Sequence, residues 1–335
     1  MATAPGLVTG RSGTIGKLHF IEDGNYWPHN TSLWVTDFMG NIPRFIYYLY
    51  DSIGMSRFSS GSGVPTLNRN DVHAFSSPIA QSLAEQQKIA ECLNSLDELI
   101  GAERQKLDAL KAHKKGLMQQ LFPSEDETVP RLRFPEFRKA KAWRKRKISE
   151  VLTKTSIPVQ VEPERTYREI GIRSHGKGVF HKEPVSGAVI ADKRVFQVVE
   201  DALVLNIVFA WERAVATTSK DEVGMIASHR FPMYVPKSES CDVRFMKHAL
   251  LTPQGKNLLG IASPGGAGRN RTLGQDIFED SGIIIPDKEE QAKIADCIRS
   301  VDDLITAQTA KLESVKSHKR GLTQQLFPPA MEAGV

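Results

Sequence analysis

The sequence has few cysteines and no long hydrophobic run, and both absences exclude classes of protein. Its three cysteines, Cys92, Cys241 and Cys297, have neither the number nor the spacing of a disulfide framework or a zinc site. The longest apolar stretch, 202–211, is interrupted by Asn206 and is too short to cross a bilayer. No charged-then-apolar leader opens the chain. We therefore expect a cytoplasmic protein with no membrane partner, no metal and no disulfide.

Acidic residues are slightly outnumbered by basic ones. The chain has 44 Lys and Arg against 39 Asp and Glu, for a formal net charge of +5. Much of the excess lies in 138–147, which carries seven basic residues and no acidic one. This concentration favours an anionic partner such as nucleic acid, although a solvated linker can have the same composition.

A phosphate-binding loop is also absent. The segment 10–17 reads GRSGTIGK, but five residues separate Gly10 from Gly16 where the phosphate loop has four. Leu18 stands where a Ser or Thr would bind magnesium. The sequence therefore gives no support to nucleotide hydrolysis.

What the chain does have is a long internal repeat. Residues 85–123 recur as 290–328 at a constant offset of 205, and 23 of the 39 aligned positions are identical. Neither copy contains an internal proline, and apolar residues follow one another at alternating steps of four and three. This spacing predicts two long helices with heptad seams that pack against each other as an antiparallel coiled coil.

Polar residues interrupt both seams at equivalent places, and they suggest a register. Glu103 and Lys114 interrupt the first seam, and Gln308 and Lys319 the second. A buried polar residue that faces an apolar one loses hydration without a partner. We therefore predict the register that sets polar against polar rather than the one a heptad away, in which Leu107 faces Gln308. The predicted pairs are Glu103 with Lys319, Lys114 with Gln308, Leu107 with Val315, and Leu110 with Leu312.

A second face of each repeated helix is lined with small residues. On the heptad frame one column contains only Ser, Ala and Gly, and a leucine lies beside it in each copy. Small residues allow close helix approach, so we predict that this column receives helices of another chain. An ordinary solvated surface is the alternative. The docking residues are Ser95, Leu99, Ala102, Ala109 and Gly116, with Ser300, Leu304, Ala307, Ser314 and Gly321.

The rest of the chain forms two α/β segments, so the fold class is α+β. The predicted order is a first globular segment at 1–84, the first helix at 85–123, a Pro-rich linker at 124–142, a second globular segment at 143–289, the second helix at 290–328 and a tail at 329–335. Single helices are expected at 43–58 and 243–261. Strands are expected at 7–9, 17–21, 32–36, 167–173, 195–199, 214–218 and 231–235.

The two globular segments are weakly similar to each other. His29, Val35, Arg44 and Phe45 match residues 200 positions later, and the pair 66–67 matches the pair 272–273. On this alignment 8–84 corresponds to about 208–289. We therefore expect that the first segment has no counterpart of roughly 143–207 and is incomplete.

Together these motifs resemble the specificity (S) subunit of type I restriction-modification systems. The resemblance lies in two variable α/β segments, each followed by the same long helix with EQQKIA at its start and KKGLMQQLFP at its end, and in PRLRFPEF after the first helix. It implies two target-recognition domains, here with a shortened first domain, each reading half of a bipartite DNA site. It also implies methyltransferase (M) and restriction-translocase (R) subunits as partners.

The catalytic chemistry of such a complex is not expected in this chain. No N/D-P-P-Y/F tetrapeptide for adenine methylation, no Walker loop and no acid-lysine nuclease cluster is present. We therefore predict a non-catalytic subunit with no cofactor and no catalytic residue.

The DNA-contacting candidates are polar residues in glycine-containing loops. Arginine can bind guanine through two hydrogen bonds and asparagine can bind adenine, although most protein–DNA hydrogen bonds go to phosphate or sugar. A loop that only packs against a helix is the alternative for each segment. The candidates are Arg269, Asn270 and Arg271 in one loop, Arg173, Ser174, His175 and Lys177 in a second, and Asn68 and Arg69 in the first domain.

Two functions remain open at this level. The first is a DNA-reading subunit that directs methyltransferase and restriction subunits to a bipartite site. The second is a truncated scaffold that docks methyltransferase subunits without reading the full site. Selection from random-sequence DNA distinguishes them, because only the first would enrich a motif.

Overall fold

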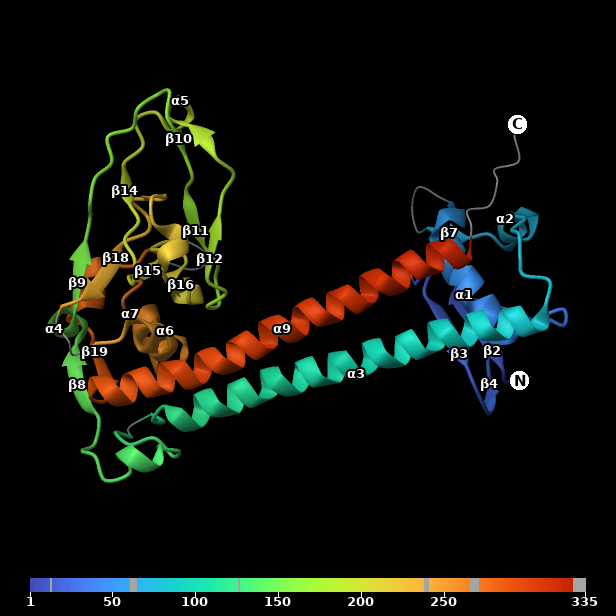
Figure 1. Ribbon diagram of the computed structural model, residues 1–335, viewed down its shortest axis with the longest axis horizontal. Coiled ribbons are helices and arrows are strands. Elements are labelled where there is room, and N and C mark those ends of the chain that lie inside the picture. Colours follow the sequence, from blue (N-terminus) through green and yellow to red (C-terminus); the bar gives the residue numbers. More distant parts are fainter. Residues whose placement is uncertain (13, 61–64, 126, 238–240, 266–270, 328–335) are drawn as a thin grey trace. The chain divides into compact units, whose positions relative to one another are not determined.

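Figure 1 shows the computed structural model, which describes residues 1–12, 14–60, 65–125, 127–237, 241–265 and 271–327. The chain divides into two compact units. Unit 1 comprises Met1–Ala109 and Ile305–Val335, and unit 2 comprises Leu110–Leu304. Each unit therefore combines one globular part with segments of both repeated helices.

Unit 1 contains a small antiparallel sheet with one amphipathic helix against it. Strands β3 (Leu18–Ile21), β2 (Gly6–Gly10) and β5 (Ser32–Trp34) lie in that order, with β2 in the middle. Helix α1 (Pro43–Ile53) buries the face that carries Phe45, Ile46, Tyr48 and Leu49. The remaining elements are β1 (Ala2–Thr3) paired with β4 (Asn25–Tyr26), η1 (Met55–Phe58), β6 (Ser59–Ser60) paired with β7 (Thr66–Leu67), and α2 (Arg69–Ala74).

Helix α1 is shorter than predicted. The sequence pattern suggested one helix over 43–58, but α1 ends at Ile53 because Gly54 takes the left-handed conformation, with φ of 74°. The Gly54 N–H donates to the Tyr50 carbonyl and closes the last turn. A separate 3₁₀ turn, η1, follows.

Unit 2 is built around a four-stranded antiparallel sheet. Its strands lie in the order β16 (Val215–Thr217), β15 (Leu203–Leu205), β18 (Met233–Pro236) and β9 (Leu152–Thr155). All three residues of β15 are completely buried, so 203–205 of the apolar run at 202–211 form a central strand. The other strands of unit 2 are β8 (Arg144–Lys147), β10 (Thr166–Tyr167), β11 (Ile170–Ile172), β12 (Val179–His181), β13 (Val185–Ser186), β14 (Val195–Gln197), β17 (Ile226–Ser228) and β19 (Gly282–Ile285).

Two-stranded antiparallel ribbons complete the strands of unit 2. They pair β10 with β13, β11 with β12, β14 with β17, and β19 with β8. The last four residues of the basic run at 138–147 form strand β8, which pairs with β19. The short helices are η2 (Pro135–Phe137), α4 (Ile148–Val151), α5 (Gly187–Ile190), η3 (Ala210–Glu212), η4 (Lys220–Glu222) and α8 (Gln275–Asp280).

The helix predicted at 243–261 is two helices. α6 (Val243–Leu251) ends before Thr252, and α7 (Pro253–Ile261) begins with Pro253. Proline has no N–H for a helix interior but suits the first helical position, and the Thr252 hydroxyl accepts the Gly255 N–H at 3.1 Å as the N-cap. The break follows from proline chemistry, which a periodicity argument overlooks.

The two repeated segments form α3 (Leu83–Leu121) and α9 (Lys288–Leu326). The α+β fold class is confirmed. In unit 1 the α3 and α9 segments run antiparallel, since Asp97 contacts Lys319 while Glu103, further along α3, contacts Lys311. Among the described residues, no helix is both long and apolar enough to span a membrane.

The predicted register of the seam is wrong by one heptad. Glu103 does not pair with Lys319. Its carboxylate instead accepts from the Gln308 amide and the Lys311 ammonium, and the Gln308 amide also donates to the Glu103 carbonyl at 3.0 Å. Lys319 binds Asp97, with Nζ–O distances of 2.6 and 2.7 Å. In unit 2, Lys114 pairs with Asp302 rather than with Gln308.

The length of the lysine side chains explains why the observed register differs from the predicted one. The prediction required each polar seam residue to have a partner directly opposite in the same layer. The lysines instead extend along the helix and place Nζ on carboxylates that lie outside the seam. Glu103 and Gln308, with 6% and 5% of their surface exposed, bond to each other along the seam. No polar seam residue is left without a partner, so the penalty that disfavoured this register does not arise.

Each globular part is joined to its long helix by the same glutamine. In unit 1 the buried Gln86 side chain accepts the Ile42 N–H at 3.0 Å and donates to the Ala80 carbonyl at 2.8 Å. In unit 2 Gln291, its repeat equivalent, accepts the Asp242 N–H at 3.0 Å and donates to the Pro286 carbonyl at 2.8 Å. The repeated EQ dipeptide therefore fixes the start of α1 or α6 to the start of α3 or α9.

The predicted linker at 124–142 is anchored at Arg133. Its guanidinium pairs with Glu290 at 2.6 and 2.7 Å and donates to the carbonyls of Ala140 and Lys141. The Arg133 and Glu290 side chains are 8% and 2% exposed. The connection therefore packs against the start of α9.

The two units share a common arrangement, and its extent refines the predicted alignment. β1 and β4 correspond to β14 and β17, the sheet β3-β2-β5 corresponds to β16-β15-β18, and α2 corresponds to α8 at an offset of 206. The described part of unit 1 has no counterpart of β8, α4 and β9 to β13. The unmatched part of unit 2 is thus about 143–194, shorter than the predicted 143–207, because β14 and β15 do have equivalents.

Candidate nucleic-acid interface

The candidate loop at 173–177 lies on the short segment that carries η3. The His175 N–H donates to the Glu212 carbonyl and the Gly176 N–H to the Arg213 carbonyl, both at 2.9 Å. Gly176 has φ of 66°, and a side chain there would begin 2.6 Å from the Leu251 side chain. The left-handed backbone and the close approach to Leu251, the last residue of α6, therefore both favour glycine at this position.

Side chains of the same loop divide into anchored and exposed groups. The Ser174 hydroxyl donates to the Glu212 carboxylate at 2.9 Å, so it is a structural contact in this state. The Arg173 guanidinium lies 4.8 Å from the Phe180 ring centroid and donates to the Val179 carbonyl at 3.1 Å. His175 and Lys177 are exposed. Arg173, His175 and Lys177 thus present polar groups to solvent from a braced backbone.

Arg271, from the other candidate loop, reaches the same segment. Its guanidinium lies 5.8 Å from the centroid of the Trp211 ring, and the Leu273 N–H donates to the Ile207 carbonyl at 2.8 Å. An isolated antiparallel bridge joins Gly265 to Arg271. Arg269 and Asn270 lie outside the described residues, so their placement stays a prediction.

Segment 206–213 therefore brings two loops together that are about 95 residues apart in sequence. It contributes two residues that the sequence analysis missed, Trp211 and Arg213. The Trp211 indole N–H donates to the Val208 carbonyl at 3.1 Å, and Arg213 takes the left-handed conformation with φ of 60°. The sequence feature that could have identified Trp211 and Arg213 is the position of their segment directly after a buried strand, because connecting loops at such positions commonly carry functional residues.

The side chains on this surface are of the types that bind DNA phosphates and base edges. Four cationic side chains, Arg173, Lys177, Arg213 and Arg271, come from three loops, and Trp211 adds an aromatic surface. Arginine and lysine neutralise phosphate charge, and arginine also binds guanine edges in the major groove. The Glu212 carboxylate is the acidic group within it, and the Ser174 hydroxyl binds that carboxylate.

The first-domain candidates lie at the start of α2. The Asn68 side chain accepts the Asn70 N–H at 3.0 Å and caps this helix, while Arg69 is exposed. The Leu67 N–H donates to the Arg11 carbonyl at 2.8 Å, as that of Leu273 does to Ile207 in unit 2. Arg11 is exposed and was also missed, because its segment was considered only as a phosphate loop.

The small-residue column lies on the helix surface. In unit 1, Ser95, Ala102 and Ala109 on α3 and Ala307, Ser314 and Gly321 on α9 are exposed. In unit 2, Ser300 is exposed and Gly116 is half-buried. Leu99 in unit 1 and Leu304 in unit 2 are 41% and 55% exposed. A Cβ at Gly116 or Gly321 would meet no atom within 4 Å, so both positions have free space.

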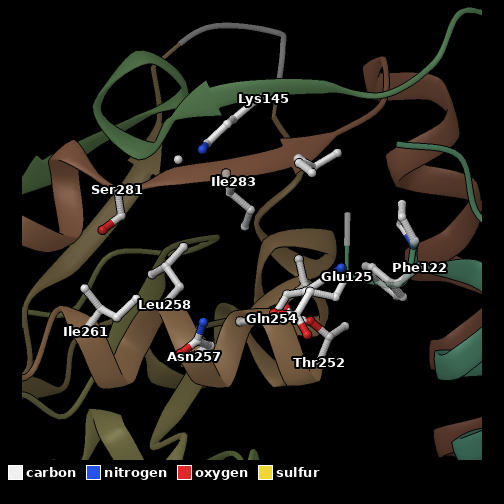
Figure 2. Close-up of a pocket in the computed structure, with 15 residues that line it drawn as sticks. Phe122, Glu125, Lys145, Thr252, Gln254, Asn257, Leu258, Ile261, Ser281 and Ile283 are labelled. Atoms are coloured by element: carbon white, nitrogen blue, oxygen red, sulfur yellow. Dashed lines mark hydrogen bonds between the residues drawn. The ribbon is translucent and has the colours of Figure 1, made fainter. Parts of the chain in front are cut away.

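One cavity of unit 2 lies away from these loops. Its volume is about 390 Å³. In Figure 2, Gln254, Asn257 and Leu258 of α7 lie on one side of it, and Lys145 and Ile283 lie on the other. Phe122 also lines it, and the ring of Phe122 stacks on Phe245 with centroids 5.2 Å apart. No side-chain hydrogen bond joins two of the residues labelled in Figure 2, so they form no acid–base pair for proton transfer. Among the described residues, no cluster of three His, Cys, Asp or Glu side chains could hold a metal ion.

The arrangement described above, two globular α/β parts combined with two repeated antiparallel helices, has known counterparts. Residues 6–112 match the family model described as the type I restriction modification DNA specificity domain. The chain is 23% identical over 294 residues to the type I restriction enzyme MjaVIII specificity subunit of Methanocaldococcus jannaschii. That match covers 80% of this chain and 65% of the relative, so the chain spans less than two thirds of that relative's length.

Solved structures agree at the level of the fold. The S subunit of a type I restriction-modification system from M. genitalium has a TM-score of 0.64 at 14% identity, over 99% of this chain and 85% of that chain. A structure that addresses complex assembly and conformational transition of the type I R-M system gives a TM-score of 0.54 at 14% identity, over 97% and 82%. The resemblance inferred from sequence is confirmed: this chain is similar to type I restriction-modification specificity subunits in sequence and in fold.

Proposed function

We propose that the chain is the DNA sequence-recognition subunit of a type I restriction-modification complex and directs partner methyltransferase and restriction subunits to a bipartite site. The observation that carries the proposal is the convergence of the 173–177 loop and Arg271 on segment 206–213. One braced surface then offers four cationic side chains and an aromatic ring. Similarity to a curated specificity subunit supports the same assignment.

In this proposal the chain recognises DNA and performs no catalysis. The matched family model describes a DNA specificity domain. Methylation, ATP hydrolysis and cleavage would belong to the partner subunits, so the purified chain should show none of these activities. The complex would act in the cytoplasm, where it meets double-stranded DNA.

The exposed helix column would receive the methyltransferase subunits. Its support is the free space at Gly116 and Gly321 together with the two exposed leucines, Leu99 and Leu304. An exposed leucine costs free energy in water, and covering it on assembly recovers about 25 cal/mol per Å² of apolar surface. The same heptad column is lined with small residues in both repeats, so both helices would take part.

Selection from random-sequence duplex DNA tests the proposal. We expect an enriched motif, and we expect Arg271→Ala to weaken binding to it by about 1 to 3 kcal/mol if Arg271 reads a base edge. Lys177→Ala should reduce the salt dependence of binding by about one phosphate contact. Arg165→Ala is a matched control for Arg173→Ala, because both arginines lie over an aromatic ring, at 5.5 and 4.8 Å.

The same selection experiment distinguishes the DNA-reading subunit from the scaffold alternative. A chain that binds methyltransferase subunits but enriches no motif would be a docking platform without full site reading. Equal binding by the parent, Arg173→Ala and Arg271→Ala on an enriched site would instead assign the two loops a structural role.

A further inference from the structure

Another pocket of unit 2 lies at the candidate nucleic-acid interface. It has a volume of about 430 Å³, and its lining combines residues of the 173–177 loop and of segment 206–213 with residues of neighbouring strands. Both aromatic and polar side chains belong to that lining. They include Phe180, Phe209 and Phe231, with Ser174 and Glu212. The pocket thus places one acidic group, the Glu212 carboxylate, beside the cationic side chains of the interface.

The Glu212 side chain is held in position from two directions. The Ser174 hydroxyl donates to Oε2 of the Glu212 carboxylate at 2.9 Å, and the Glu212 carbonyl accepts the His175 N–H at 2.9 Å. Glu212 is the last residue of η3, and its N–H donates to the Phe209 carbonyl at 3.0 Å. Backbone and carboxylate are therefore positioned before a ligand arrives, which lowers the entropic cost of a specific contact.

No cation neutralises this carboxylate in the part of the chain that the structure describes. Arg173 and Arg271 each lie over an aromatic ring, and Arg213 donates to the Leu251 carbonyl at 3.3 Å. Glu212 is half-buried, and its Oε1 accepts no hydrogen bond from a described residue. This oxygen is therefore available to a ligand that brings its own N–H group.

A carboxylate on a DNA-binding surface can bind few groups of DNA. Phosphates repel it, and it has no hydrogen to donate to the acceptors of the bases. In the major groove its targets are the amino groups of cytosine and adenine. The adenine amino group stands beside N7, an acceptor that a carboxylate cannot satisfy, whereas the cytosine amino group stands beside an apolar C5–H edge. Because phenylalanine rings line the pocket, cytosine is the better match.

We propose that Glu212 is a specificity-determining residue that accepts a hydrogen bond from the N4 amino group of one cytosine in the bound DNA. The C5 edge of that base would lie against the phenylalanine rings of the pocket. The inference rests on the proposed DNA-reading function and adds to it the base that one residue recognises. In this arrangement the bond from Ser174 positions the carboxylate, and Oε1 receives the amino N–H.

Selection from random-sequence duplex DNA with the full-length parent chain and with Glu212→Gln tests the assignment. Glutamine keeps an oxygen for the Ser174 hydroxyl, but its amide also donates, and glutamine binds N6 and N7 of adenine together. We expect two motifs that differ at one position, where adenine replaces the cytosine of the parent motif. Glu162→Gln is the control, because it also removes one negative charge from an exposed carboxylate of unit 2 and should leave the motif unchanged.

Modified bases test the reading of the amino group itself. In a base pair, N4-methylcytosine replaces the N–H that faces the major groove with a methyl group, whereas 5-methylcytosine keeps that N–H. Each modified base is placed at each cytosine of the parent motif in turn. At one position N4-methylcytosine should weaken binding of the parent by about tenfold or more. 5-Methylcytosine at that position should bind about as well as cytosine, and Glu212→Ala should bind cytosine and N4-methylcytosine equally.

Two results would overturn the inference and leave DNA reading in place. One is an unchanged motif in Glu212→Gln, and the other is an N4-methylcytosine penalty that persists in Glu212→Ala. Either would mean that Glu212 only holds the 173–177 loop. A parent chain that enriches no motif would instead refute the proposed function, on which the inference depends. If Glu212→Gln loses its circular dichroism signal, the modified-base comparison between the parent and Glu212→Ala still decides.

Discussion

Replacement of Gln86 by alanine should loosen the joint between the first globular part and its long helix. The Gln86 side chain is 1% exposed and makes three hydrogen bonds. It accepts the Ile42 N–H at 3.0 Å and donates to the Asn41 side chain and the Ala80 carbonyl, both at 2.8 Å. The substitution removes all three bonds and leaves the surrounding groups to be satisfied by water.

The cost can be worked out from these contacts. A protein hydrogen bond contributes about 1 kcal/mol net, and a buried group left unpaired costs about 1 to 3 kcal/mol. Ile42, Asn41 and Ala80 are each half-buried, so water replaces part of the loss. We expect Gln86→Ala to destabilise unit 1 by about 2 to 3 kcal/mol.

The chain provides a matched control one residue away. Gln87 is exposed, and among the described residues its side chain bonds to Glu91 at 2.8 Å; its equivalent in the second repeat is Ala292. Gln87→Ala should therefore change stability by less than about 0.5 kcal/mol. Because two units need not unfold together, a local measurement is required.

Hydrogen exchange measured by mass spectrometry gives that local readout. Gln86→Ala should speed exchange in 42–53 by about 30- to 150-fold, the factor for 2 to 3 kcal/mol, and should leave 242–251 unchanged. Gln291→Ala should do the reverse. Equal exchange of 42–53 in Gln86→Ala and Gln87→Ala would refute the reasoning.

Three other outcomes are expected. Hydrogen bonds from Lys311 and Gln308 lower the pKa of Glu103. The stability that Glu103 contributes is therefore present above about pH 4.5 and is lost as the pH falls through the lowered folded-state pKa. Glu103→Gln should reduce this loss of stability at low pH, measured by urea titrations at several pH values. Burial holds the pKa of His248 well below 6.5, so protonation destabilises unit 2 as the pH falls below 6.5, and His248→Leu should remove that loss in the same titrations. The double variant Gly116→Leu, Gly321→Leu should keep the chain folded, because both positions have free space, and should block copurification with methyltransferase subunits; normal assembly would show that the column is plain surface.

Local chemistry in the sequence was enough to predict several parts of this structure. A gap-free repeat with steps of four and three defines two helices, and the result needs no knowledge of the rest of the chain. The strand predictions near 7–9 and 32–36 also correspond to elements of the sheet in unit 1. The same patterns predicted the α+β fold class and the family. Such features depend on residues close together in sequence, where periodicity and turn chemistry act directly.

The register of the long helices depended on tertiary structure. Several antiparallel registers bury apolar seam residues against apolar seam residues, so only the polar seam residues distinguish one register from another. The prediction assumed that each polar residue pairs with the residue directly opposite it in the seam. In the folded chain Lys319 extends to Asp97, and Glu103 bonds to Gln308 along the seam. The reach of long side chains decides between registers, and sequence spacing does not contain that information.

The candidate interface was also decided only by tertiary structure. The sequence singled out the 173–177 loop and Arg271 separately, and the sheet brings both onto the segment that follows β15. Trp211 and Arg213 gained significance only through that contact.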